Sequence, residues 1–138
     1  MREFSFEILS PERIIYQRKI VSLVAPGVEG YLGVMANHAP MLAALTVGQV
    51  KSTDASNASS YFALSGGILG VSKDQVTLLA DAAEKAEEID VGRAESAKSR
   101  ALSRLSKRSP DVDIAKAHAS LMRALNRLHV AAKRTGRG

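Results

Sequence analysis

Four arginines in the C-terminal part of the chain are the residues best suited to bind a ligand. Arg93 and Arg100 are seven residues apart, and Arg123 and Arg127 are four residues apart. On an α-helix, these spacings place the members of each pair on one face. A planar guanidinium matches a phosphate in a bidentate contact, and each charge-assisted hydrogen bond contributes about 1.5–3 kcal/mol. Two such faces brought together would suit a polyphosphate ligand.

A break in the chain predicts how the two pairs meet. Residues 109–111, Ser-Pro-Asp, interrupt the helical pattern, and so short a break favours neighbouring antiparallel helices. Folding about residue 109 would place Arg93 opposite residue 125, between the two arginines of the second pair, and Arg100 opposite His118. Four like charges across one seam repel one another unless an anion lies among them.

Two other interpretations of these arginines stay open. Residues 1–84 carry 6 Lys/Arg against 8 Asp/Glu, whereas residues 85–138 carry 13 against 6. The arginines could be the solvated basic faces of two surface helices, or a patch that makes the protein a basic helical-hairpin adaptor for nucleic acid. Against the second interpretation, residues 85–138 contain no Phe, Tyr or Trp on which bases could stack.

Other chemistry-bearing residues do not form a recognisable catalytic or metal site. The three histidines have no acidic or cysteine cluster at metal-ligand spacing. Ser65-Gly66-Gly67 matches no nucleophile or phosphate-loop motif, and Glu87-Glu88 lies in a polar connector that would not raise a carboxyl pKa. We therefore predict a protein that is not an enzyme and holds no metal.

Residues 1–84 have the pattern of an all-β sandwich. Phe4, Phe6 and Ile8 alternate with polar residues, and several short β-branched runs follow, separated by Gly, Pro and Ser/Asn turns. No helix-length segment lies between these runs, which favours a sandwich or flattened barrel over a parallel sheet. We expect about ten short strands.

Residues 85–138 have the pattern of an antiparallel α-helical hairpin. Ala, Glu, Lys, Arg and Leu dominate, Asp90 is a candidate N-cap, and alanines recur at heptad positions. We predict helices at about 91–107 and 112–134. An alanine-lined contact buries little apolar area, so at about 25 cal/mol per Å² the hairpin should lie close to balance between closed and open.

Composition sets wider bounds on the protein. The chain has no cysteine, which excludes disulfides, and no apolar run near the ~20 residues that a membrane span needs. The N-terminal residues have neither a signal-peptide nor a transit-peptide pattern. A cytoplasmic protein without membrane insertion is the expectation.

Five motifs in order resemble one known family. The first four are a Gly-rich turn, a His-Ala-Pro motif and two strand-like segments, and the fifth opens the first predicted helix. They are Gly27–Gly33 (GVEGYLG), Asn37–Pro40 (NHAP), Ser65–Leu69 (SGGIL), Val76–Asp81 (VTLLAD) and Ile89–Ala94 (IDVGRA). Over essentially its whole length, the chain resembles the epsilon subunit of bacterial F-type ATP synthases.

The resemblance implies site residues in both parts of the chain. In the C-terminal part it implies ATP as a regulatory ligand, not a substrate, with four residues around the adenosine and four arginines at the phosphates: Glu84, Ile89, Asp90, Ala94, Arg93, Arg100, Arg123 and Arg127. In the N-terminal part it implies contacts with the gamma subunit and the rotor ring at Ser10, Tyr31, His38 and Met41. Tyr31 stands where relatives commonly carry a glutamate.

The resemblance also implies the role. A subunit of this family sits in the central stalk at the cytoplasmic face of the bacterial inner membrane. Its sandwich would link the gamma subunit to the membrane rotor ring. Its hairpin would sense ATP and, when extended toward the beta subunits, inhibit ATP hydrolysis.

Overall fold

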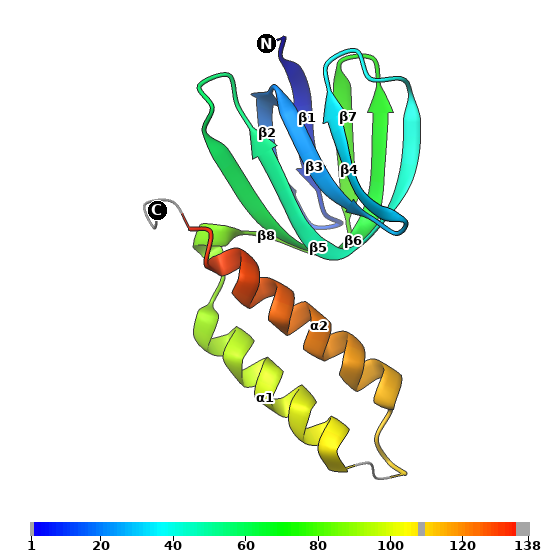
Figure 1. Ribbon diagram of the computed structural model, residues 1–138, viewed down its shortest axis with the longest axis vertical. Coiled ribbons are helices and arrows are strands. Elements are labelled where there is room, and N and C mark those ends of the chain that lie inside the picture. The colour runs from blue at the N-terminus through cyan, green and yellow to red at the C-terminus, as the bar shows by residue number, and fades with distance from the viewer. Residues whose placement is uncertain (1, 108–109, 135–138) are drawn as a thin grey trace. The chain divides into compact units, whose positions relative to one another are not determined.

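The computed structural model describes residues 2–107 and 110–134 and divides the chain into two compact units, 1–85 and 86–138 (Figure 1). We predicted a boundary between residues 84 and 85. Within the described residues, no helix is long and apolar enough to cross a membrane.

The first unit is built from strands. Within the described residues there are eight: β1 (Phe4–Leu9), β2 (Ile14–Ile20), β3 (Ser22–Gly27), β4 (Gly30–Met35), β5 (Met41–Thr53), β6 (Ser59–Ser72), β7 (Gln75–Ala80) and β8 (Ala83–Lys85). This is fewer than the roughly ten short strands expected, because β5 and β6 are long, at 13 and 14 residues. The all-β sandwich itself is confirmed.

The strands form one strongly curved sheet in the order β2-β1-β7-β6-β5-β3-β4, with β8 added to β6 (Figure 1). β1 and β7 are parallel, and the other neighbours are antiparallel. Curvature brings the inward faces together over a common core. The alternation seen in β1 places Phe4, Phe6 and Ile8 in that core, together with Phe62 and Leu69.

Two glycines let β6 pass through the curved region beside β7. Gly66 has φ of +111° and Gly67 has φ of +155°. A Cβ on Gly67 would lie 2.2 Å from the carbonyl oxygen of Leu79, on the neighbouring strand. Close approach of two backbones therefore requires glycine at this position.

The second unit is a helical hairpin. A short 3₁₀ turn, η1 (Ala86–Glu88), leads into α1 (Val91–Lys107), and α2 (Ile114–Ala131) follows the turn (Figure 1). The bounds of α1 agree with the prediction, and the carboxylate of Asp90 accepts the backbone N–H of Arg93 at 3.0 Å, as an N-cap does.

The second helix is shorter than predicted. The carboxylate of Asp113 accepts the backbone N–H of Lys116, so α2 begins two residues later than expected. At the other end, Ala132 closes the helix by donating to the carbonyl of Leu128. The helix was predicted to run to about residue 134, and this prediction is wrong beyond Ala131.

Replacing Gly67 with Ala should lower the free energy of unfolding of the sandwich by about 2–3 kcal/mol, because the added Cβ meets a backbone oxygen that cannot move away. Urea unfolding followed by tyrosine fluorescence measures this, since all three tyrosines lie in residues 1–85. Gly70→Ala is the matched control in the same strand: its nearest new contacts are at 3.9 Å. An equal loss of unfolding free energy in both variants would contradict the conclusion that close backbone approach requires glycine at position 67.

Candidate functional site

Alanines form the contact between the two helices. Ala94 and Ala101 of α1 are buried, as are Ala117, Ala124 and Ala131 of α2. They recur every seven residues, whereas the leucines at the interleaved positions of α2, such as Leu121, are only half-buried. We call these five residues the alanine seam. Small side chains let the helix backbones approach closely, but they remove little apolar area from water.

The helix bounds set which residues lie level across the hairpin. Because α1 ends at Lys107 and α2 begins at Ile114, the chain turns about a point between residues 110 and 111. Equal rise along both helices then places Arg93 level with Leu128 and Arg100 level with Leu121. These levels differ by three residues, nearly one helical turn, from those predicted from the sequence with the turn at residue 109.

The corrected levels divide the arginines into two tiers. Arg93 comes next to the level of Arg127, and Arg100 lies within two residues of the level of Arg123. Each tier therefore holds one arginine from each helix. The levels predicted from the sequence instead placed Arg93 between Arg123 and Arg127, with Arg100 two turns away.

The alanine seam also determines the side of the hairpin on which the arginines lie. On α1, Arg93 and Arg100 each directly precede a buried alanine. On α2, Arg123 directly precedes buried Ala124, and Arg127 lies one turn further along the same side. In antiparallel helices, positions that precede the contact residue on either helix share one side of the pair. We call this side the arginine flank.

The side chains on this flank differ in exposure. Arg93, Arg100 and Arg123 are exposed, and Arg127, nearest the seam, is half-buried. Arg123 donates to the hydroxyl of Ser120 at 3.1 Å, a contact within its own helix. Three guanidinium groups on the flank are therefore accessible to an anion from solvent.

The remaining predicted ATP residues have structural positions of their own. Ile89 and Ala94 are buried, and Ala94 belongs to the alanine seam. Asp90 is exposed and caps α1. Glu84 lies in β8, where it pairs with Ala63 of β6. Ile89, Asp90 and Ala94 thus hold the start of α1, beside Arg93.

One contact at the open end of the hairpin was missed from the sequence. The guanidinium of Arg134 donates from Nε to the carbonyl of Ala86 at 3.2 Å, and from its terminal nitrogen to the carbonyl of Ile89. Ala86 and Ile89 are buried, as is Val130 near the end of α2. This contact, the Arg134 clasp, ties the segment after α2 to the segment before α1.

A basic residue just beyond a helix end is the only signal that could have suggested the clasp. Lys133 shares that signal, so the sequence could not single out Arg134.

The four predicted interface residues of the sandwich do not gather in one place. Ser10 follows β1, at the end of the sheet that holds the β3–β4 turn, and Tyr31 lies beside this turn in β4, as the strand register shows. His38 and Met41 lie toward the other end, where Met41 pairs with Val71. Tyr31 is 61% exposed, and its hydroxyl accepts the backbone N–H of Gln49.

An exposed apolar surface was also missed. Ala44, Ile68 and Leu79 are register partners on adjacent strands β5, β6 and β7, all exposed, and Leu42 beside them is 80% exposed. We call these four residues the outer apolar strip. Its signal in the sequence is the apolar pairs Ile68-Leu69 and Leu78-Leu79, which place an apolar side chain on both faces of a strand. Contiguous exposed apolar residues of this kind are typical of interaction sites.

Metal ligands are not assembled in the part of the chain that the structure describes, where no group of three or more His, Cys, Asp or Glu side chains could hold an ion.

Comparisons with known proteins cover both units. Residues 3–86 match the family model for the beta-sandwich domain of the ATP synthase delta/epsilon chain, and residues 87–132 match the model for its long alpha-helix domain. Two curated relatives are each named ATP synthase epsilon chain. The one from Moorella thermoacetica is 45% identical over 78% of this chain and 81% of its own length, and the one from Syntrophomonas wolfei is 45% identical over 76% and 77%.

Solved structures share the fold. A chain in the cryo-EM structure of the Euglena gracilis mitochondrial ATP synthase, with OSCP, F1 and c-ring, has a TM-score of 0.80 at 20% identity, covering 96% of this chain and 82% of that one. A chain of the Tetrahymena thermophila mitochondrial ATP synthase central stalk and c-ring has a TM-score of 0.60 at 14% identity, covering 96% of both. Family models over both units and relatives at 45% identity show that the chain belongs to the ATP synthase delta/epsilon chain family, with the bacterial epsilon chains among its relatives.

Proposed function

We propose that the protein is a non-catalytic subunit in the central stalk of a bacterial F-type ATP synthase, peripheral to the cytoplasmic face of the inner membrane. The sandwich links the gamma subunit to the membrane rotor ring, and the hairpin senses ATP and inhibits ATP hydrolysis. Family membership supports the stalk role. The outer apolar strip supports docking, because it offers a partner apolar area on three adjacent strands.

The arginine flank is the observation that carries ATP sensing. Two tiers of arginine, each drawn from both helices, present guanidinium groups on one side of a closed hairpin. A triphosphate bound there would neutralise charges that otherwise repel. Glu84, Ile89, Asp90 and Ala94 are proposed to lie around the adenosine; of these, Ile89 and Ala94 would act by holding the start of α1 in position.

Inhibition requires a hairpin that opens. The alanine seam contributes little burial, so closed and open states can differ by only a few kcal/mol. A ligand at 100 times its Kd stabilises the state it prefers by about 2.7 kcal/mol, whereas reversing a 1:99 balance needs about 5.5 kcal/mol. ATP therefore shifts the hairpin only because the seam is weak. Open, the basic helices would extend toward the beta subunits and hinder hydrolysis.

The Arg134 clasp belongs to the closed state in this proposal. It joins residues on either side of the helix pair, so the hairpin cannot open without breaking both hydrogen bonds.

Calorimetric titration of the isolated protein with ATP should give saturable heat below about 1 mM. Arg100→Gln and Arg123→Gln, one from each helix, should each weaken binding by about tenfold, because each removes a charge-assisted contact with phosphate. Absence of heat up to about 1 mM would overturn ATP sensing.

The control for this titration is Lys98→Gln. Lys98 lies four residues after Ala94 and so on the other side of the seam from the arginine flank. It should change affinity by less than about threefold, an effect of net charge alone. If Lys98→Gln lost as much ATP affinity as the arginine variants, the arginines would contribute only diffuse electrostatic attraction and would not form a binding site.

Arg134→Met should shift the hairpin toward the open state by about 1.5–3 kcal/mol, through the loss of hydrogen bonds from a charged donor. The chain has no cysteine, so cysteines introduced at exposed Ser96 and His129 can carry spin labels whose separation reports opening. Lys116→Met removes an exposed charge from α2 and serves as the control. An unchanged distance distribution in Arg134→Met would remove the clasp from the mechanism.

Removing residues 88–138 should leave assembly of the synthase and its coupling intact while raising the rate of ATP hydrolysis, because the sandwich retains its docking surface and the inhibitory helices are absent. Hydrolysis by the purified complex and proton pumping into vesicles measure the two effects. Failure of the shortened chain to assemble would show that docking and regulation are not divided between the two units.

A further inference from the structure

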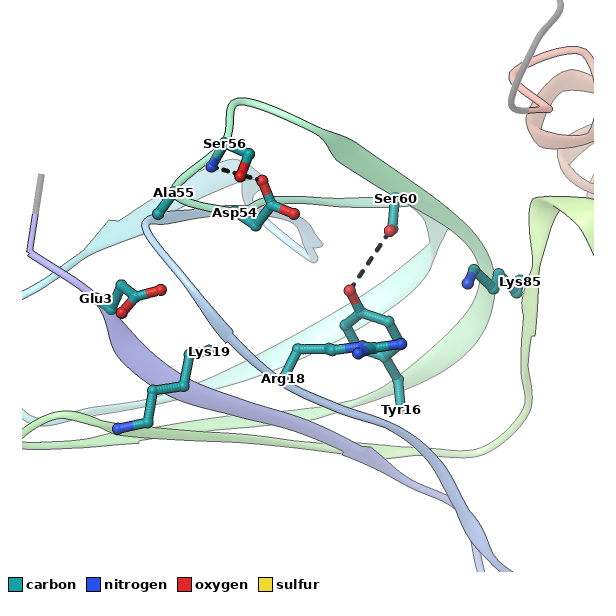
Figure 2. A pocket seen from close by; sticks show the side chains of 9 residues that line it. All are labelled: Glu3, Tyr16, Arg18, Lys19, Asp54, Ala55, Ser56, Ser60 and Lys85. Atoms are coloured by element: carbon teal, nitrogen blue, oxygen red, sulfur yellow. Dashed lines mark hydrogen bonds between the residues drawn. The ribbon is translucent and has the colours of Figure 1, made fainter.

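The sandwich contains a polar pocket that the proposed function does not use. It has a volume of about 480 Å³ and lies among β2, the β5–β6 turn and β8 (Figure 2). Three cations, two carboxylates and three side-chain hydroxyls at its wall come from segments far apart in the sequence. The lining residues that matter here are Tyr16, Arg18, Lys19, Asp54, Ser60 and Lys85. We call it the Tyr16 pocket.

Tyr16 is held rigidly at the wall of the pocket. Its ring packs edge-on against Phe62, with centroids 4.8 Å apart, and against Phe6 at 6.2 Å. Its hydroxyl points to the hydroxyl of Ser60 at 3.4 Å, as Figure 2 shows. A ring anchored on core phenylalanines gives the pocket a fixed wall with a pair of hydroxyls at its edge.

Two cations are held beside this ring. The guanidinium carbon of Arg18 lies 6.0 Å from the ring centroid and the ammonium of Lys85 lies 5.8 Å from it, which is the range of cation–π attraction. Within the described residues, neither cation forms a salt bridge to a carboxylate. Both line the pocket, so their charge is available to a ligand inside it.

The carboxylates of the pocket do not cancel this charge. One oxygen of Asp54 accepts the backbone N–H groups of Ser56 and Ala58, at 2.9 and 3.0 Å, so this carboxylate is engaged in its own turn. In Figure 2, Glu3 lies at the opposite end of the pocket from Ser60 and Lys85. Three cations against two carboxylates leave the lining with a net positive charge.

A buried hydroxyl on the strand next to Ser60, that of Ser52, also lacks a partner within the described residues. Ser52 is only 1% exposed, and within the described part of the chain its Oγ has no hydrogen-bond partner. Ser52 is the register partner of Ser60, so both side chains stand on the same face of the sheet. A buried polar group left unsatisfied commonly marks water or a ligand nearby.

We propose that the Tyr16 pocket binds a phosphate group. Arg18 offers a planar fork, Lys85 a compact charge, and Tyr16 and Ser60 hydroxyl donors, which together match the oxygens of phosphate. All residues that line this pocket belong to the first unit, and none of them belongs to the arginine flank. The phosphate could belong to a small soluble molecule or to a lipid headgroup, which share this chemistry.

Amide chemical-shift mapping of the full chain with inorganic phosphate, at constant ionic strength with chloride exchanged for phosphate, tests the soluble source. Saturable shifts are expected around Arg18, Ser56 and Ser60. Arg18→Gln and Lys85→Gln should each weaken binding by about tenfold. The matched control is Lys51→Gln, since Lys51 lies 5.9 Å from the centroid of Tyr61, outside the pocket, and makes the same kind of cation–π contact.

Sedimentation with phosphatidylglycerol vesicles, against phosphatidylcholine vesicles, tests the lipid source with the same three variants. Binding of phosphate, or of phosphatidylglycerol vesicles alone, that is weakened by Arg18→Gln and Lys85→Gln but not by Lys51→Gln supports the site and identifies the source. If the protein binds neither phosphate nor phosphatidylglycerol vesicles, or if Lys51→Gln weakens binding as much as the other two variants do, the proposed phosphate site is overturned. The amide spectrum of each variant also shows whether its fold is intact. Because Arg18 and Lys85 lie outside the arginine flank, these variants should not reproduce the loss of ATP affinity expected for Arg100→Gln and Arg123→Gln.

Discussion

Contact between alanines governs the second unit. A seam of Ala94, Ala101, Ala117, Ala124 and Ala131 holds two helices together with the smallest side chains that still exclude water. Alanine explains both the close approach of the backbones and the weak stabilisation. Its side chain is small, and each buried methyl group removes little apolar area from water. A leucine seam would hold the helices further apart and far more firmly. The proposed regulation depends on that weakness, since a hairpin locked by its own core could not respond to a ligand.

The seam also places the charges. Arginines that directly precede seam residues on antiparallel helices share one flank, and repulsion among them adds to the weakness of closure. The Arg134 clasp acts in the opposite direction, by hydrogen bonding the buried start of the unit. Closure is thus a balance between one clasp, a thin apolar contact and like charges. In the proposed mechanism, a bound anion would reduce the repulsion among the arginines.

The first unit solves a different problem, which is to present a stable surface. A single curved sheet buries one face of each strand, and its core contains the three phenylalanines of the chain, Phe4, Phe6 and Phe62. Where consecutive apolar residues occur, as at Ile68-Leu69, one side chain enters the core and the other joins the outer apolar strip. Anchored on the same core, Tyr16 carries two cations at the pocket wall. One packed core therefore supports both the outer apolar strip, proposed here to dock a partner, and a candidate phosphate site.

Much of this was determined by the sequence alone. Alternation in residues 4–8 and the alanine heptads set the two kinds of structure, and Asp90 marked the start of α1 correctly, because capping and periodicity are local properties. Five motifs in the expected order were sufficient to identify the family. By contrast, the pivot of the hairpin was placed wrongly from the sequence, since it depends on where Asp113 caps α2.

Only the tertiary structure decided which charges have partners and which side chains meet. Arg134 contacts carbonyls 45 and 48 residues away, and Tyr16, Ser60 and Lys85 reach one pocket from three separate strands. Nothing in the local pattern distinguishes Arg134 or Lys85 from the other basic residues of a chain with 19 of them. Their roles follow from contacts between distant segments, which packing alone creates.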